Sequence, residues 1–111
     1  MSFKVRLSDN FIRSAKQLAK KYPSLKNDLP LLNEALAENP EMGTPLGKNL
    51  YKIRMPITSK GRGKSGGARV ITCVVHKSEQ MLLAEIYDKA QYETVDDTKI
   101  IKVLKDEGFD V

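Results

Sequence analysis

A change in hydrophobic period predicts the first two elements of the chain. Over residues 3–7, apolar side chains alternate with basic ones, and a period of two is typical of a strand with one buried face. Over residues 11–22, apolar positions recur every three or four residues, which predicts an amphipathic helix. Ser8 or Asp9 is the expected N-cap. Pro23 ends the helix because its ring disfavours helical backbone at the preceding residue.

A stripe of leucines over residues 25–36 predicts a second helix. Pro30 interrupts this stripe, and a proline inside a helix removes one backbone hydrogen bond. Two interpretations stay open: the helix kinks at Pro30, or it begins afresh there with Asp28 as its N-cap. The helix is expected to end at Asn39. The glycines and the proline of residues 41–47 predict a loop.

Three strands are predicted in the second half of the chain. Over residues 50–55 the period returns to two, with Lys52 and Arg54 on the face opposite the apolar odd-numbered positions. A glycine-rich loop is expected to follow. Residues 69–76 and 81–87 are rich in β-branched and other apolar side chains, and they predict two buried strands. Because a short polar turn joins them, they are expected to form an antiparallel hairpin.

A last helix is predicted close to the final residues. Thr94 and Asp97 resemble a capping box, and Gly108 stands where a C-terminal cap belongs. The predicted order is therefore β-α-α-β-β-β-α, a single α+β domain over residues 1–111 with two N-terminal helices packed on a small antiparallel sheet. The helices are expected to cover one face of this sheet and to leave the other face free for binding.

The positive charge of the chain is concentrated in its centre. The 111 residues include 19 Lys or Arg and 14 Asp or Glu, which gives a net charge of +5. No acidic residue occurs between Met42 and Ser78. Such a stretch is the footprint expected for a polyanion, although a mixed charged surface that clusters by chance gives the same pattern. Its basic residues are Lys48, Lys52, Arg54, Lys60, Arg62, Lys64, Arg69 and Lys77.

Three of these cations are expected to meet on the sheet. Lys52 and Arg54 share one face of their strand, and Arg69 opens the next strand just past the loop. A cluster of like charges destabilises a sheet, but it suits the binding of a phosphate. We therefore expect these three side chains to hold a phosphate of a bound nucleic acid.

The residues that the chain lacks exclude several kinds of chemistry. The single cysteine, Cys73, and the single histidine, His76, cannot build a structural zinc site. Residues 61–67 are glycine-rich, but they lack the spacing of a phosphate-binding P-loop, and a strand is expected after them rather than a helix. We expect neither a metal nor an organic cofactor. A lone cysteine and the lack of a long apolar run favour the cytoplasm.

Several segments, taken in order, resemble the RelE/ParE superfamily of toxins. These segments are YKIR at residues 51–54, GGARVI at 66–71 and IYDK at 86–89. Within that superfamily, the HigB-like branch is the most similar, through GKSGGARV at residues 63–70, FIRSAKQL at 11–18 and KKYPSL at 20–25. The resemblance covers nearly the whole chain. It depends on the order and joint presence of the motifs rather than on any one of them.

The resemblance implies both a fold and a function. It implies a RelE-like domain that cleaves messenger RNA in the ribosomal A site without a metal, inhibits translation and is neutralised by a cognate antitoxin. Such a chain is the toxin of a type II toxin–antitoxin system. The family's C-terminal tyrosine is replaced here by Val95, so two alternatives stay open: the nearby Tyr92 takes its role, or that role is lost. By motif, Lys52 corresponds to a catalytic lysine, Arg54 to a second basic residue, Arg69 to the arginine on the scissile phosphate and Lys89 to a further basic residue.

These residues suggest a division of labour in RNA cleavage. The arginines are suited to stabilise the charge of the transition state. Lys52 is a candidate base, because neighbouring cations favour the neutral form of an amine. Lys89 is a candidate acid or phosphate ligand, so the base and the acid stay unassigned. The residues expected to bind RNA or the ribosome are Lys48, Lys60, Arg62, Lys64 and Lys77.

Two other functions fit the same sequence. A ParE-like inhibitor of DNA gyrase would share the fold and cut nothing, but its sheet typically lacks the basic residues found here at Lys52, Arg54 and Arg69. A non-catalytic RNA-binding module would bind RNA in a salt-dependent way without cleaving it. The clustered cations favour the nuclease.

Overall fold

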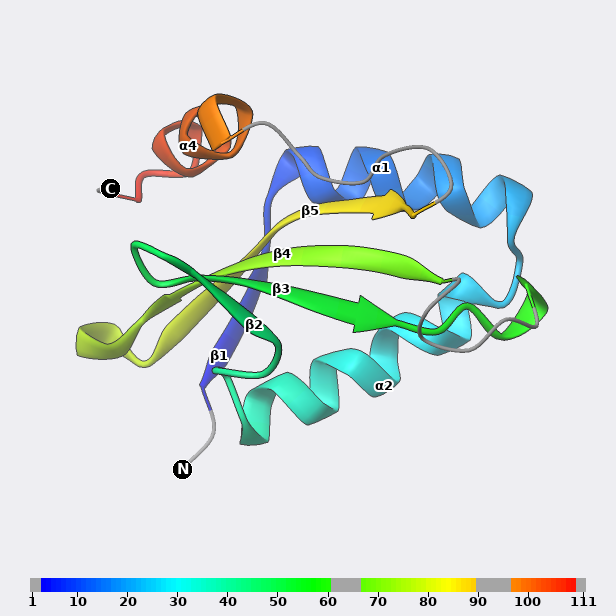
Figure 1. Cartoon of the computed structure of the whole chain (residues 1–111), viewed down its shortest axis with the longest axis horizontal. Helices are drawn as coiled ribbons and strands as arrows, with labels where there is room; N and C mark the ends of the chain where they lie inside the picture. The colour runs from blue at the N-terminus through cyan, green and yellow to red at the C-terminus, as the bar shows by residue number, and fades with distance from the viewer. Residues whose placement is uncertain (1–2, 61–66, 90–96, 110–111) are drawn as a thin grey trace.

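The computed structural model describes residues 3–60, 67–89 and 97–109 of the chain. Within these ranges, five strands form one sheet and three α-helices pack on it, as Figure 1 shows. Two 3₁₀ turns, η1 and η2, follow β3 and β4. The elements are β1 (Lys4–Leu7), α1 (Asp9–Lys21), α2 (Leu25–Glu38), β2 (Thr44–Gly47), β3 (Leu50–Met55), η1 (Thr58–Lys60), β4 (Ala68–Val75), η2 (His76–Ser78), β5 (Gln80–Asp88) and α4 (Asp97–Asp106).

The strands lie in the order β1-β5-β4-β3-β2. The β3–β4 and β4–β5 pairs are antiparallel, as the predicted strand meander requires. The predicted α+β class, with two N-terminal helices on a small antiparallel sheet, is thus confirmed. One pair differs, because β1 runs parallel to β5 at the edge of the sheet. This is possible because α1 and α2 intervene between β1 and the rest of the sheet, and parallel neighbours need such a long connection.

The predicted loop over residues 41–47 is wrong in its second half. Thr44–Gly47 forms the edge strand β2, in which Pro45 lies opposite Tyr51 of β3. Proline cannot donate a backbone hydrogen bond, but an edge strand needs partners on one side only. All four residues of β2 are exposed, so there is no hydrophobic alternation by which the sequence could reveal this strand.

The first helix has the predicted N-cap, and the second helix is uninterrupted at Pro30. Ser8 caps α1, because its Oγ accepts a hydrogen bond of 2.9 Å from the backbone N–H of Phe11. The second helix is continuous from Leu25 to Glu38 with Pro30 inside it, so it does not begin afresh at that residue. Asp28 is therefore not its N-cap, and its carboxylate has other partners, described below.

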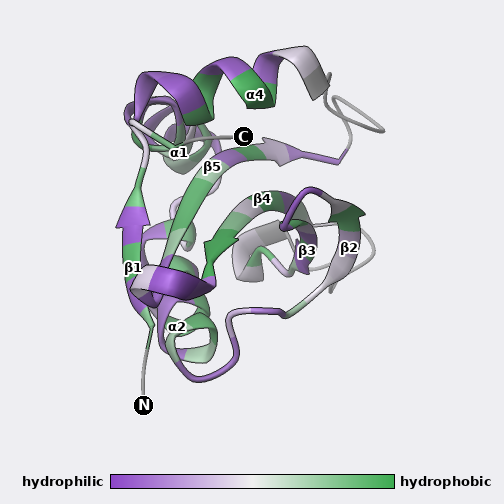
Figure 2. Ribbon diagram, turned by 90° about the vertical axis from the view of Figure 1, so that its left-hand side faces the viewer, coloured by the Kyte–Doolittle hydropathy of each residue, from purple (hydrophilic) through white to green (hydrophobic). Residues whose placement is uncertain are grey.

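The helices cover both faces of the sheet, contrary to the expectation that one face stays free. On one face, α1 and α2 bury a core that contains Phe11, Leu25 and Leu36. On the other face, Ile100 and Leu104 of α4 pack in a second core with residues of β3, β4 and β5. Figure 2 shows β4 and β5 between α4 on one side and α2 on the other. Enclosure from both sides explains why nearly all of β4 is buried.

The predicted end of the last helix is confirmed. Gly108 has a φ of +83°, a left-handed conformation that glycine adopts without strain. The N–H of Phe109 donates to the carbonyl of Leu104 over 2.8 Å, and that of Gly108 donates to Lys105 over 3.0 Å. This pair of bonds is a Schellman cap. The predicted capping residue Thr94 lies outside the described residues.

Candidate active site

A row of three side chains crosses the centre of the sheet. Arg54 of β3 lies opposite Arg69 of β4, which in turn lies opposite Tyr87 of β5. Directly opposite residues of antiparallel strands point to the same face and have Cβ atoms about 4.5–5.5 Å apart. The register therefore brings two arginines together, although 12 residues, from 56 to 67, connect the facing ends of their strands.

Arg69 is buried, with only 5% of its surface exposed. Its Nη1 donates a hydrogen bond of 3.2 Å to the carbonyl of Ala68. Burial lowers the pKa of the Arg69 guanidinium, and the charge of Arg54 lowers that pKa further, whereas Tyr87 acts in the opposite direction. A guanidinium keeps its proton at neutral pH even so. The two arginines thus repel each other, and a phosphate between them would relieve that repulsion.

Lys52 completes the predicted group of cations. It lies opposite Ile71 and two residues before Arg54, so it is on the same face of the sheet as both arginines. Lys52 is half-buried and Arg54 is exposed. Two residues along a strand span about 7 Å. The structure therefore brings Lys52, Arg54 and Arg69 together, as the sequence predicts.

The backbone at this end of the sheet is tightly packed. A Cβ added at Gly67 would overlap the carbonyl oxygen of Met55 and lie 2.9 Å from the Cα of Pro56. The carbonyl of Gly67 accepts a hydrogen bond of 3.2 Å from the N–H of Lys89. Lys89 is exposed and follows the last residue of β5, so it lies at the same end of the sheet as the two arginines. Gly67 thus joins the ends of β3 and β5.

Buried Asp28 anchors the segment that follows β3, a role that sequence analysis missed. Its Oδ2 accepts from the N–H of Thr58 over 3.1 Å and from the Oγ of Ser24 over 2.9 Å, and its Oδ1 accepts from the Oγ1 of Thr58 over 2.7 Å. The Oγ of Ser24 also accepts from the N–H of Ser59 over 2.8 Å. These bonds attach η1 to the first turn of α2. A lone aspartate in a leucine stripe is the signal that reveals it.

The predicted RNA-binding cations do not form one group. Lys48 lies in the turn between β2 and β3, and Lys77 lies in η2, so both are at the end of the sheet opposite Arg54 and Arg69. The length of β4 separates the two ends by about 20 Å. Lys60 ends η1, on the arginine side. Arg62, Lys64 and Tyr92 lie outside the described residues.

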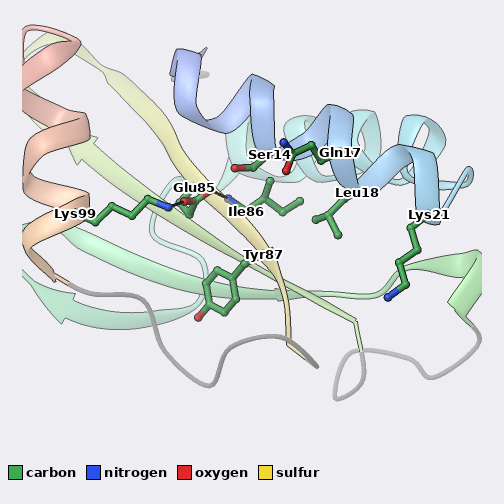
Figure 3. A pocket seen from close by; sticks show the side chains of 8 residues that line it. All are labelled: Ser14, Gln17, Leu18, Lys21, Glu85, Ile86, Tyr87 and Lys99. Atoms are coloured by element: carbon green, nitrogen blue, oxygen red, sulfur yellow. Dashed lines mark hydrogen bonds and ion pairs between the residues drawn. The ribbon is translucent and has the colours of Figure 1, made fainter.

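Tyr87 also lines a cavity, which sequence analysis did not predict. The cavity has a volume of about 220 Å³ and lies between α1, β5 and α4 (Figure 3). Burial raises the pKa of the Tyr87 hydroxyl, and the nearby charge of Arg69 partly offsets this. No sequence signal reveals the cavity, because its walls come from three distant segments. It is lined by Ser14, Gln17, Leu18, Lys21, Glu85, Ile86, Tyr87 and Lys99.

Glu85 is a buried carboxylate at one end of this cavity. Its Oε2 lies 2.9 Å from the Nζ of Lys99 on α4, and its Oε1 accepts from the N–H of Ile86 over 3.0 Å. Burial alone would raise the pKa of Glu85, but hydrogen bonds from Lys99, Asn10, Ser14 and the Ile86 N–H lower it overall. Glu85 is therefore held as a carboxylate, with its charge matched by Lys99.

The cysteine and the histidine lie away from the arginines. Cys73 is buried in the second core, and burial raises the pKa of its thiol, which makes the thiol less reactive. His76 follows β4 and contacts Glu41 at 3.2 Å. Among the described residues, no group of three or more His, Cys, Asp or Glu side chains is placed to hold a metal ion.

No protein-family model and no curated protein matches the chain by sequence. The structure is similar to that of a free E. coli toxin RelE in which two arginines are replaced by alanine. The TM-score is 0.64 at 13% sequence identity, and the match covers 92% of this chain and 97% of that one. The chain has a RelE-like fold. This likeness extends over nearly the whole chain. No helix in the described ranges is long and apolar enough to span a membrane.

Proposed function

We propose that this chain is a toxin of a type II toxin–antitoxin system that cleaves messenger RNA in the ribosomal A site. The proposed reaction needs no metal, and cleavage of the messenger RNA stops its translation. Two facts support the proposal: the chain has the fold of a known toxin, and its sheet carries a cluster of cations. The motifs at residues 63–70, 11–18 and 20–25 favour the HigB-like branch of these toxins.

The facing of Arg54 and Arg69 across the β3–β4 ladder is the observation that carries the proposal. Like charges directly opposite each other destabilise a sheet. Arg69 is also buried, which increases the free energy of holding its charge there. A phosphate that accepts hydrogen bonds from both arginines would offset their mutual repulsion.

The chemistry proposed is an attack within the RNA itself. The 2′-oxygen forms a bond to the adjacent phosphorus, and the bond from phosphorus to the 5′-oxygen breaks. A base takes the proton of the 2′-hydroxyl and an acid gives one to the leaving 5′-oxygen. The products are a 2′,3′-cyclic phosphate and a 5′-hydroxyl. Arg54 and Arg69 stabilise the charge that develops on the phosphorane oxygens.

The proposed proton transfers use polar groups other than the two arginines. Lys52 shares the face of the arginines and is the proposed base. Lys89, at the same end of the sheet, and Tyr92 are the proposed acids or phosphate ligands. A cognate antitoxin is the proposed protein partner, because a basic cleavage site is harmless to its own cell only when it is covered or deformed.

Induction of the chain in cells, followed by mapping of RNA 5′ ends, tests this function. The expected result is a set of new 5′ ends within translated codons, which vanish when translation initiation is blocked and when the antitoxin is co-expressed. Intact messenger RNA with DNA breaks would instead identify a gyrase inhibitor. RNA binding without new ends, with ribosomes present, would identify a binding module.

A further inference from the structure

The edge of β5 is open beyond Leu83, because β1 pairs only with Gln80–Leu83. Side chains close this edge instead of a further strand. The Oγ of Ser8 and the Nδ2 of Asn10 both donate to the carbonyl of Ala84 over 3.0 Å. The carboxylate of Glu85 accepts from the N–H of Ile86. These bonds occupy the positions that another strand would use, so this edge is not suited to strand pairing.

The cavity of about 220 Å³ lies at this closed edge. Leu18, Ile86 and Tyr87 form an apolar wall, and Ser14 and Gln17 add polar groups from α1. The volume is below the 300–1,000 Å³ that is typical of sites for whole small ligands. A cavity of this size, open to solvent, suits one unit of a polymer whose remainder lies elsewhere on the protein.

The charges of the cavity favour an anion at one end. Figure 3 shows the Glu85–Lys99 pair at one end and Lys21 at the other, with Tyr87 between them. Glu85 and Lys99 neutralise each other across 2.9 Å. The charge of Lys21 is therefore uncompensated among the residues that line the cavity.

Lys21 contacts the ring of its neighbour Tyr22. Its Nζ lies 5.4 Å from the centre of the Tyr22 ring, a distance typical of a cation–π contact. The hydroxyl of Tyr22 donates to the Oδ2 of Asp88 over 2.9 Å. Asp88 is fully buried at the end of β5. Through Tyr22, Lys21 is held near the end of β5, the strand that carries Tyr87.

Tyr87 connects the cavity to the arginines, because it lines the cavity and lies directly opposite Arg69. From Arg54 through Arg69 to Tyr87 the row spans two interstrand spacings, about 10 Å. The cavity lies beyond Tyr87, on the side of β5 that faces away from β4. A chain that starts at the arginines and crosses the strands would reach Lys21, whereas one that follows the strands would reach Lys48 and Lys77.

We propose that this cavity is a subsite for the nucleotide next to the scissile phosphate, with Lys21 as the contact for that nucleotide's own phosphate. The inference rests on the proposed function. It states that RNA crosses the strands from Arg54 over Arg69 and Tyr87 to Lys21. Lys48 and Lys77 then lie outside the path of the RNA, in contrast to the prediction from the sequence.

Lys21→Gln, with Lys20→Gln as its matched control, tests the path. Lys20 is a neighbouring exposed lysine in the last turn of the same helix, but it does not line the cavity. The measurement is the affinity of the full chain for a short single-stranded RNA as a function of salt. Loss of one phosphate contact reduces the slope of log K against log salt by about 0.7. We expect this reduction for Lys21→Gln and an unchanged slope for Lys20→Gln.

Arg69→Ala, measured in parallel, separates the two proposals. If Lys21→Gln and Lys20→Gln have the same slope while Arg69→Ala loses RNA cleavage on ribosomes, the subsite is refuted and the proposed function stands. If Arg69→Ala cleaves as the wild type does, the proposed function itself fails. Unchanged thermal unfolding of both lysine variants establishes that any change in slope comes from the lost charge.

Discussion

Tyr22 and Asp88 join the end of α1 to the end of β5 through one hydrogen bond of 2.9 Å. Sixty-six positions separate the two residues in the chain. Asp88 is fully buried, so its carboxylate depends on partners within the protein. This contact holds the C-terminal end of α1 beside the end of β5, where Tyr87 completes the row with Arg54 and Arg69.

Replacement of Tyr22 by Phe is expected to lower the free energy of unfolding by about 1–3 kcal/mol, because it removes a donor from a buried carboxylate. Urea unfolding measures the change. Tyr51→Phe is the control, since the hydroxyl of Tyr51 makes no hydrogen bond within the described ranges of the chain. Equal stability of the two variants would show that the Tyr22 hydroxyl contributes nothing at this contact.

Asp28→Ala is expected to lower the free energy of unfolding by roughly 2–3 kcal/mol, because three donors lose a charged acceptor. Glu34→Ala provides a control on the same helix, at an exposed position. Chemical denaturation again supplies the measurement. A loss no larger than that of the control would contradict the anchoring of η1 by Asp28.

The lowered pKa of Glu85 gives stability a defined dependence on pH. An unfolded glutamate has a pKa of about 4.3, and the folded value lies below that. The contribution of Glu85 is thus present above the unfolded pKa and is lost as the pH falls through the folded one. Unfolding free energies between about pH 6 and pH 2 should fall less steeply for Glu85→Gln than for the wild type. Identical slopes would refute this role of the Glu85–Lys99 pair.

Gly67→Ala is expected to destabilise the chain by about 1–3 kcal/mol, because the added methyl group would overlap backbone atoms of Met55 and Pro56. Backbone cannot move aside as a flexible side chain can, so the ends of β3 and β4 must shift. Thermal unfolding and the amide signals of both strands report such a shift. A variant as stable as the wild type would show that β3 and Gly67 are less closely packed.

The parts of the fold that depend on local pattern could be predicted from the sequence. The alternation around Lys52 and Arg54 identified which face of β3 is charged, and Ser8 and Gly108 identified the ends of two helices. The parallel β1–β5 pair could not be predicted, because neither strand encodes its partner locally. Edge strand β2 was hidden by Pro45 and by its complete exposure.

The candidate site, like the fold, could be predicted only where it depends on local sequence pattern. The three cations follow from strand alternation and from their order along the chain. The alignment of Arg54 with Arg69 depends on the register of the ladder, which the sequence alone does not set. Lys21 and Glu85 were missed, because the cavity that they line forms only when α1 and α4 pack beside β5.

The rate at which Arg69→Ala cleaves messenger RNA on purified ribosomes tests the central claim most directly. Lys26→Ala, which removes an exposed charge from α2, serves as the control. Loss of a group that stabilises the transition state costs about 10²–10³ in rate, so we expect Arg69→Ala to fall by at least this factor and the control to match the wild type. Cleavage by Arg69→Ala at the wild-type rate would contradict the claim that the opposed arginines hold the scissile phosphate.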